Sequence, residues 1–276
     1  MHAADASTAS NQSAVSRARR ALELLDLTEL GDNATAADVD RLCARADGIH
    51  GSVAAVCVWP RFVAQSVATM AGSGVRVATV VNFPSGDLAV DAVLAETDRA
   101  LADGADEIDL VLPYTAFAAG DVAAAAAMID AVRGRLHVGS DRLLKVILET
   151  GELGGAELID RAARLAIRHG ADFIKTSTGK TSISATPAAT AIMLRAIDEL
   201  DRRVGLKPSG GIRSSSDAQT YLDQADHVMG AQWVSARTFR FGASGLLDAL
   251  IATIVGAAPP ATTGSPGDGA PASEVY

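Results

Sequence analysis

The sequence has few of the residues that build disulfide frameworks, metal centres or membrane spans. Its 276 residues include two cysteines, Cys43 and Cys57, without C-x-x-C spacing, and five scattered histidines, so we expect neither a disulfide framework nor a metal site. A membrane helix needs about 20 consecutive apolar residues, and no segment comes near that length. The N-terminus also lacks the apolar segment of a signal peptide. These absences predict a cytoplasmic protein.

The net charge excludes another class of partner. A formal net charge of -9 argues against a general surface for nucleic acid or anionic membrane. An anionic ligand would therefore be a small molecule held by a local site. Hydrophobic residues make up 49% of the chain, enough for a full core, and the length fits one large α/β barrel or two smaller domains.

The two ends of the chain differ in composition from the rest. Residues 1–15 are small and polar, and residues 256–276 are rich in Pro, Gly, Ala, Ser and Thr. Such segments bury too little apolar surface to fold on their own. We predict a flexible N-terminal segment at 1–15, one folded domain at 16–255 and a flexible C-terminal tail at 256–276.

Within the domain, short β-branched runs alternate with alanine-rich segments of helical length. The runs are continuously apolar, as in a parallel sheet that is covered on both faces. Eight strand and helix units in about 230 residues favour a (β/α)8 TIM barrel over the alternative, a doubly wound open sheet. The predicted strands are Leu24–Leu27, Ala54–Trp59, Arg76–Phe83, Glu107–Leu112, Leu143–Glu149, Phe173–Ser177, Gly205–Pro208 and Gln232–Ala236.

Two neighbouring strands each carry a lysine near their ends, Lys175 and Lys207. Adjacent parallel strands would hold the two side chains at similar heights, with backbones on the order of 5 Å apart. Burying an ammonium without a partner costs several kcal/mol, so the pair calls for an explanation beyond packing. One explanation is that each lysine forms a structural ion pair with a carboxylate.

The other explanation is nucleophilic catalysis. A nucleophilic lysine must lose its proton, which means lowering a pKa near 10.4 by about three units, or roughly 4 kcal/mol. At about 6 Å and an effective dielectric of 20, repulsion from a second ammonium supplies roughly 2–3 kcal/mol, and desolvation adds to it. The pair therefore predicts a Schiff base with a carbonyl compound. Spacing alone leaves open whether Lys175 or Lys207 is the nucleophile.

Three further strands carry polar residues. Asp109 lies in an apolar strand, where it could relay protons beside an imine or hold Lys175 or Lys145 in an ion pair. Lys145 lies earlier in its strand, which favours an interior ion pair over a nucleophilic role. Asp26 and Thr28 end the first predicted strand and could bind a substrate hydroxyl or cap a helix.

Glycine-bearing loops follow the last three predicted strands. Barrels commonly hold phosphate on backbone amides of the loops after strands seven and eight and at nearby helix N-termini. A single Gly-Gly pair is more often only a turn, but two such loops beside the lysine pair predict a phosphate site. Its candidate residues are Thr178, Gly179, Lys180, Gly210, Gly211, Arg213, Gly242 and Ser244.

The order of these motifs resembles the 2-deoxyribose-5-phosphate aldolase family, which are class I, Schiff-base aldolases with a (β/α)8 fold. The resemblance covers roughly Leu22 to Val255. It rests on Leu25-Asp26-Leu27-Thr28, Val80-Val81-Asn82-Phe83-Pro84-Ser85-Gly86, Gly104-Ala105-Asp106-Glu107-Ile108-Asp109, Lys145-Val146-Ile147-Leu148-Glu149-Thr150-Gly151-Glu152-Leu153, Gly170-Ala171-Asp172-Phe173-Ile174-Lys175-Thr176-Ser177-Thr178-Gly179-Lys180, Gly205-Leu206-Lys207-Pro208-Ser209-Gly210-Gly211-Ile212-Arg213 and Arg240-Phe241-Gly242-Ala243-Ser244.

The resemblance implies an acetaldehyde imine on Lys175, with Lys207 lowering the pKa of Lys175 and Asp109 relaying protons. The implied reaction is the reversible cleavage of 2-deoxy-D-ribose 5-phosphate to D-glyceraldehyde 3-phosphate and acetaldehyde, in deoxynucleoside breakdown. It needs no metal or other cofactor, and its partners are small phosphosugars and aldehydes. A homodimer is a family expectation. Some members use a C-terminal tyrosine on a flexible tail in proton transfer, which implies the same for Tyr276.

Two positions depart from the family pattern. Gly245 stands where a second serine often follows the position of Ser244, so a backbone amide would replace that hydroxyl, and Ser85 stands where related members often have histidine. Cys57 reads as a small core residue, although a carbonyl substrate could trap it if it lines the barrel. The alternative functions are a phosphosugar-binding barrel without turnover and a Schiff-base enzyme of another substrate, such as a transaldolase.

Overall fold

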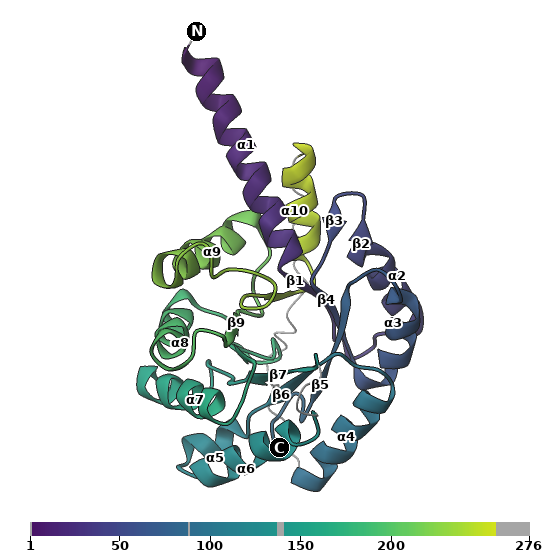
Figure 1. Cartoon of the computed structure of the whole chain (residues 1–276), viewed down its shortest axis with the longest axis vertical. Helices are drawn as coiled ribbons and strands as arrows, with labels where there is room; N and C mark the ends of the chain where they lie inside the picture. The colour runs from purple at the N-terminus through teal and green to yellow at the C-terminus, as the bar shows by residue number, and fades with distance from the viewer. Residues whose placement is uncertain (1, 88, 137–140, 258–276) are drawn as a thin grey trace, which may run out of the picture.

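The computed structural model describes residues 2–87, 89–136 and 141–257. Within them, eight parallel strands form one sheet in the order β10, β1, β4, β5, β6, β7, β8, β9. Parallel bridges from Leu206 to Phe239 and from Ser209 to Gly242 join the two ends of this order and close the barrel (Figure 1). The predicted (β/α)8 barrel is confirmed. The strands are β1 (Leu25–Glu29), β4 (Ala55–Val58), β5 (Arg76–Val81), β6 (Glu107–Val111), β7 (Leu143–Ile147), β8 (Phe173–Lys175), β9 (Gly205–Lys207) and β10 (Phe241–Ala243).

Helices surround the barrel and cover the outer face of the sheet (Figure 1). Their starts follow the local sequence: Thr186 caps α8 by accepting a hydrogen bond from the Ala189 amide at 3.1 Å, with Pro187 in the first turn, as the sequence predicts. The helices are α1 (His2–Glu23), α2 (Ala36–Ala46), α3 (Val63–Met70), α4 (Val90–Ala102), α5 (Tyr114–Ala118), α6 (Val122–Arg133), α7 (Ala156–Arg168), α8 (Pro187–Leu200), α9 (Ser215–Met229) and α10 (Leu246–Val255), with a 3-10 turn η1 (Pro60–Phe62) and a small hairpin of β2 (Asp47–Gly48) and β3 (Gly51–Ser52).

Helix α1 differs from the expectation for the N-terminus. It includes residues 2–15, for which the sequence predicts a flexible segment, and its first turns extend beyond the barrel (Figure 1). Alanine is the strongest helix former, so an alanine-rich segment that joins a packed helix can continue it. The packed part lies further along, where Ala18, Ala21 and Leu22 are buried and α1 contacts α9 and α10.

The eighth strand was predicted at the wrong place. Residues 232–236 form turns, and Trp233 packs on the core while its indole donates to the Arg202 carbonyl at 2.7 Å. The strand is β10 at Phe241–Ala243, only three residues long and with a glycine in the middle, so it has no apolar periodicity to recognise. Gly242 is required there because a Cβ would lie 2.6 Å from the Cβ of Ser209.

No helix among the described residues combines the length and the apolar character that crossing a membrane would need.

Candidate active site

Pairing of β8 with β9 places the two predicted lysines side by side. Lys175 and Lys207 are direct register partners, so their side chains enter the barrel at the same height. On β6 and β7, Asp109 is likewise the partner of Lys145. The barrel interior therefore holds a cluster of charged side chains that are at most 3% exposed, namely Asp26, Glu107, Asp109, Lys145, Lys175, Lys207 and Arg240.

Asp109 is the centre of this cluster. Its Oδ2 accepts hydrogen bonds from Lys175 Nζ and Lys207 Nζ, each at 2.8 Å, and its Oδ1 accepts one from Lys145 Nζ at 2.8 Å. Burial alone would raise the pKa of Asp109, but the three ammonium groups hold it well below its usual range. A single ionised carboxylate thus sets the positions of all three lysines.

The two strand lysines have different partners. Lys207 is fully buried and pairs with Asp26 at 2.5 Å as well as with Asp109. Burial would lower the pKa of Lys207, but the two carboxylates raise it overall. Among the described residues, the one carboxylate that pairs with Lys175 is the shared Asp109, so burial and the charge of Lys207 outweigh that carboxylate, and the pKa of Lys175 is lowered. The structure therefore distinguishes the lysines, which sequence spacing does not.

Lys145 belongs to the structural part of the cluster. It is fully buried, and its Nζ lies 2.6 Å from Glu107 Oε2 and 2.8 Å from Asp109 Oδ1. Burial opposes its charge, but these carboxylates raise its pKa overall. The predicted interior ion pair of Lys145 is confirmed. Arg240 continues the network by donating to Glu107 at 3.1 Å and to Asp26 at 2.6 Å.

Asp26 has a different place from the one that its sequence position indicates. The sequence indicates that Asp26 ends the first strand and binds a substrate hydroxyl or caps a helix, but β1 continues to Glu29 and Asp26 is fully buried inside it. Its oxygens pair with Lys207 and Arg240, and these cations hold the pKa of Asp26 below its usual range against the effect of burial. We therefore assign Asp26 to the ion-pair network rather than to a hydroxyl of the substrate.

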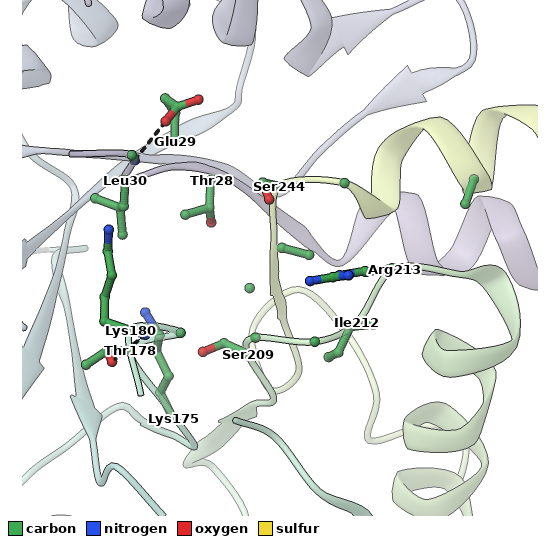
Figure 2. A pocket seen from close by; sticks show the side chains of 18 of the residues that line it. Thr28, Glu29, Leu30, Lys175, Thr178, Lys180, Ser209, Ile212, Arg213 and Ser244 are labelled. Carbon is green, nitrogen blue, oxygen red and sulfur yellow. Dashed lines mark hydrogen bonds between the residues drawn. The ribbon is translucent and has the colours of Figure 1, made fainter. Parts of the chain in front are cut away.

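A cavity of about 990 Å³ opens at the carboxyl ends of the strands, where barrels carry their chemistry. Lys175 reaches its floor, and Arg213 extends toward its middle from the start of α9 (Figure 2). Neither Lys207 nor Asp109 is among the lining residues. The structure brings the other sequence-predicted residues together around this cavity: Thr28, Thr178, Gly179, Lys180, Gly210, Gly211, Arg213, Gly242 and Ser244.

The chain is similar to known aldolases in sequence and in structure. A family model described as "DeoC/LacD family aldolase" matches residues 20–251. The chain belongs to this aldolase family. A curated deoxyribose-phosphate aldolase of Agrobacterium fabrum is 53% identical over 239 residues, which cover 86% of this chain and 92% of that protein.

Solved structures agree with the family and the fold of this aldolase. A candidate deoxyribose-phosphate aldolase of Coccidioides immitis superposes with a TM-score of 0.75 at 31% identity, over 86% of each chain. One of Toxoplasma gondii superposes with a TM-score of 0.81 at 27% identity, over 89% of this chain and 97% of that one. The deoxyribose phosphate aldolase of Aeropyrum pernix, described as a unique tetramer, shares the fold at a TM-score of 0.71 and 24% identity.

The two helix starts at the cavity of the aldolase differ in how they are capped. At α9, the carboxylate of Asp217 accepts from the amides of Arg213 and Ser214, so this end is satisfied by its own capping box. At α10, the cap is Gly245, and no side chain caps the first turn. The amides of α10 beside Ser244 are therefore better placed to receive an anion.

Sequence reasoning missed some residues of the aldolase cavity, among them Ser209 and Leu30. The Ser209 hydroxyl donates to the Ser177 carbonyl, and the Ser209 amide donates to the Thr176 hydroxyl at 3.0 Å. Ser209 stands within the glycine loop after β9, so its position directly before Gly210 was the available signal. Leu30 follows β1, and an isolated leucine carries no signal of a site.

Of the two remaining candidate residues, the structure describes Cys57 but not Tyr276. Cys57 is fully buried in a small cluster with Leu30, Ala78 and Val80, so its prediction as a core residue is confirmed, and burial raises the pKa of its thiol. Tyr276 lies outside the described residues. Among those residues, no group of three or more His, Cys, Asp or Glu side chains is arranged to hold a metal ion.

Proposed function

We propose that this aldolase reversibly cleaves 2-deoxy-D-ribose 5-phosphate to D-glyceraldehyde 3-phosphate and acetaldehyde, through an imine on Lys175. The observation that carries the assignment is the asymmetry of the lysine pair. Lys175 lines the cavity and has a lowered pKa, whereas Lys207 lies beneath it with two carboxylate partners and a raised pKa. The accessible, more easily deprotonated amine is the better nucleophile.

The reaction follows from an amine at that position. Neutral Nζ of Lys175 attacks the C1 aldehyde of the open-chain sugar, and the resulting carbinolamine takes up a proton and loses water to give an iminium ion. The iminium accepts the electron pair of the C2–C3 bond while the C3 hydroxyl loses its proton, which releases glyceraldehyde 3-phosphate and leaves an enamine. Protonation at C2 and hydrolysis then release acetaldehyde and restore the amine.

Asp109 and Lys207 support this sequence of steps from below the cavity. Because Asp109 stays ionised, it stabilises the iminium cation that forms on Lys175. Lys207 shares the same carboxylate oxygen and keeps the resting amine of Lys175 from holding its proton. In this proposal Asp109 relays protons between Lys175 and Lys207, because both ammonium groups donate hydrogen bonds to its Oδ2.

The phosphate of the substrate would bind on the loops after β8, β9 and β10. Gly179 and Lys180 come from the first loop, Gly211 and Arg213 from the second, and Ser244 from the third. Two cationic side chains and an open helix N-terminus make this side of the cavity suited to a dianion. The opposite end of the sugar then reaches Lys175.

Borohydride trapping tests the proposal directly. Borohydride reduces an acetaldehyde imine to an ethylated lysine, and we expect the ethyl group on the peptide that contains Lys175. Label on the Lys207 peptide would overturn the assignment, and an unlabelled protein would overturn the Schiff-base mechanism. A retro-aldol assay on deoxyribose 5-phosphate separates the other functions: trapping without cleavage indicates another carbonyl substrate, and phosphosugar binding without trapping indicates a sensor.

We further propose a cytosolic enzyme of deoxynucleoside breakdown that acts on small phosphosugars and aldehydes and assembles as a homodimer. Both cysteines, Cys43 and Cys57, are free and buried, which fits a reducing compartment. The proposed catalytic domain spans residues 16–255. Sedimentation at several protein concentrations tests the assembly, and a monomer or a tetramer at all of them would contradict it.

A further inference from the structure

The loop after β8 has no regular secondary structure between Thr176 and Thr186, yet it supplies Thr178, Gly179 and Lys180 to the cavity. A free loop of this length would not hold backbone amides in one orientation. Its order therefore depends on contacts with neighbouring loops. On one side, the Ala185 amide donates to the Ser209 carbonyl at 3.2 Å.

On the other side, the loop rests on Glu149, which lies just beyond the end of β7. Glu149 Oε2 accepts hydrogen bonds from the amide and the hydroxyl of Thr178, at 3.1 and 2.5 Å. Glu149 Oε1 accepts another from the Thr181 hydroxyl at 3.2 Å. One carboxylate thus binds both ends of the turn that contains Gly179.

Glu149 occupies this place at a cost. It is fully buried, and burial raises the pKa of its carboxyl against the hydrogen bonds from Thr178. Its backbone φ is +53°, in the left-handed region that costs a non-glycine residue about 1 kcal/mol or more. Glu149 does not line the cavity, so contact with substrate does not account for either feature.

The hydroxyl of Thr178 connects Glu149 to the backbone of Lys180. Since its proton is donated to Glu149, its oxygen is free to accept a hydrogen bond from the Lys180 amide at 3.0 Å. Gly179 between them has a φ of +80°. The chain from Glu149 through Thr178 to Lys180 therefore holds the turn whose backbone faces the cavity.

A second contact from the same segment acts further along the loop. Gly151 packs so closely on Ile183 that a Cβ at this position would meet the Ile183 carbonyl oxygen. The Thr150 amide also donates to the Thr176 carbonyl at 2.9 Å. Contacts with residues 149–151 therefore help to fix the backbone conformation of the loop after β8.

We propose that Glu149 is a positioning residue for recognition of the phosphate group: it holds the turn at Gly179 in the conformation that binds a dianion, without touching the substrate. The inference rests on the proposed phosphosugar substrate. It predicts that Glu149 is needed for the phosphate but not for imine formation on Lys175, which lies on the strand rather than in the loop.

The test compares Glu149→Ala with Glu149→Gln in the full chain. For Glu149→Ala we expect the inhibition constant of inorganic phosphate and the KM for deoxyribose 5-phosphate to rise roughly tenfold. Cleavage of unphosphorylated deoxyribose should change less than about threefold. Glu149→Gln keeps an acceptor oxygen for Thr178, so it should restore most of the phosphate affinity. Equal losses on the two sugars, or an unchanged inhibition constant, would overturn the proposal.

Two controls separate this inference from the proposed function and from misfolding. Acetaldehyde trapping on Lys175 requires no phosphate, so it should persist in Glu149→Ala; its loss there but not in the parent chain would overturn the positioning role. Gly151→Ala should repeat the selective loss by displacing the loop. Gly155→Ala is its matched control, because a Cβ at Gly155 meets no atom within 4 Å. Equal effects of the two glycine variants would also overturn the proposal.

Discussion

At the scale of single residues, the number of carboxylate partners decides what each buried lysine can do. Lys145 and Lys207 each have at least two such partners and raised pKa values, while Lys175 has one shared partner and a lowered pKa. The same ammonium group thus has a raised pKa at two positions and a lowered pKa at the third, which is the position of the proposed nucleophile. Burial alone cannot cause the difference, because all three are almost completely buried.

Removal of the Lys207 charge should make Lys175 harder to deprotonate. Both Nζ atoms lie 2.8 Å from one oxygen of Asp109, so Lys207→Met removes a close like charge and leaves more of the carboxylate to Lys175. Each change raises the pKa of Lys175. Since only the neutral amine attacks, we expect the acid limb of the kcat/KM profile to move to higher pH and activity at pH 7 to fall roughly tenfold or more.

The pH profile of Lys207→Met is best compared with that of Lys207→Arg, which keeps the positive charge. The limb of the arginine variant should lie closer to that of the parent enzyme. An acid limb that stays in place in Lys207→Met would contradict the electrostatic role of Lys207.

At the scale of elements, loops that follow strands far apart in the sequence meet at the cavity. Lys180 from the loop after β8 forms an ion pair with Asp32 from the loop after β1, at 2.6 Å. Its ammonium also lies 6.0 Å from the ring centre of Trp59. A bound phosphate would therefore compete with Asp32 for Lys180.

Removal of that competitor should help phosphate binding. Asp32 is largely exposed, so its pair with Lys180 is screened by solvent and its effect is small. For Asp32→Asn we expect the KM for deoxyribose 5-phosphate at low ionic strength to fall roughly two- to fivefold, with kcat nearly unchanged. Steady-state kinetics at low and high salt measure this. A KM that rises in the variant would show instead that Asp32 helps to place Lys180.

At the scale of the whole molecule, the charged interior of the barrel links activity to stability. The pKa of Lys175 is lowered in the folded state, so the unfolded chain holds this proton more tightly. The resulting cost to stability is full below the folded-state pKa and vanishes above about 10.5. Lys145 has the opposite sign: its raised pKa contributes stability below about 10.5, which is lost only as the pH rises through the folded value.

Methionine at these two positions should therefore have unequal effects at pH 7. Lys175→Met should abolish activity. It should lower the free energy of unfolding by less than about 1 kcal/mol, or raise it. Lys145→Met removes one of the buried cations that pair with Glu107 and Asp109, so the negative charge of these carboxylates is less well compensated, and the change should cost roughly 3–5 kcal/mol. Urea unfolding of both variants checks the difference, and similar losses would contradict this account of the network.

The C-terminal tyrosine remains a prediction from the sequence. If Tyr276 assists proton transfer between imine and enamine, deletion of this residue should slow exchange of the acetaldehyde α-protons, by roughly tenfold or more for a general acid–base group. Exchange is followed by NMR in heavy water, with Tyr276→Phe as the companion variant. An unchanged exchange rate in the deletion would refute the role.

Local sequence specified the elements of the barrel wherever periodicity and helix caps agree. Seven strands and the start of α8 at Pro187 were predicted because apolar runs and a Thr-Pro cap are local signals. The eighth strand was missed because closing the barrel requires a small residue where Gly242 passes Ser209, and that close approach is a tertiary contact. The proposed catalytic residues Lys175, Lys207 and Asp109 were likewise predictable, because each is a charged residue in an apolar strand.

The way in which those charges share partners could be read only from the folded barrel. Residue types and their order were enough to predict a lysine pair, a carboxylate and a set of glycine loops, but they left the nucleophile open and placed Asp26 with the substrate. Strand register brings Asp26 to Lys207 and leaves Lys175 at the cavity. Electrostatic energies depend on distances and burial between segments far apart in the chain, so residue type and spacing along the chain cannot supply them.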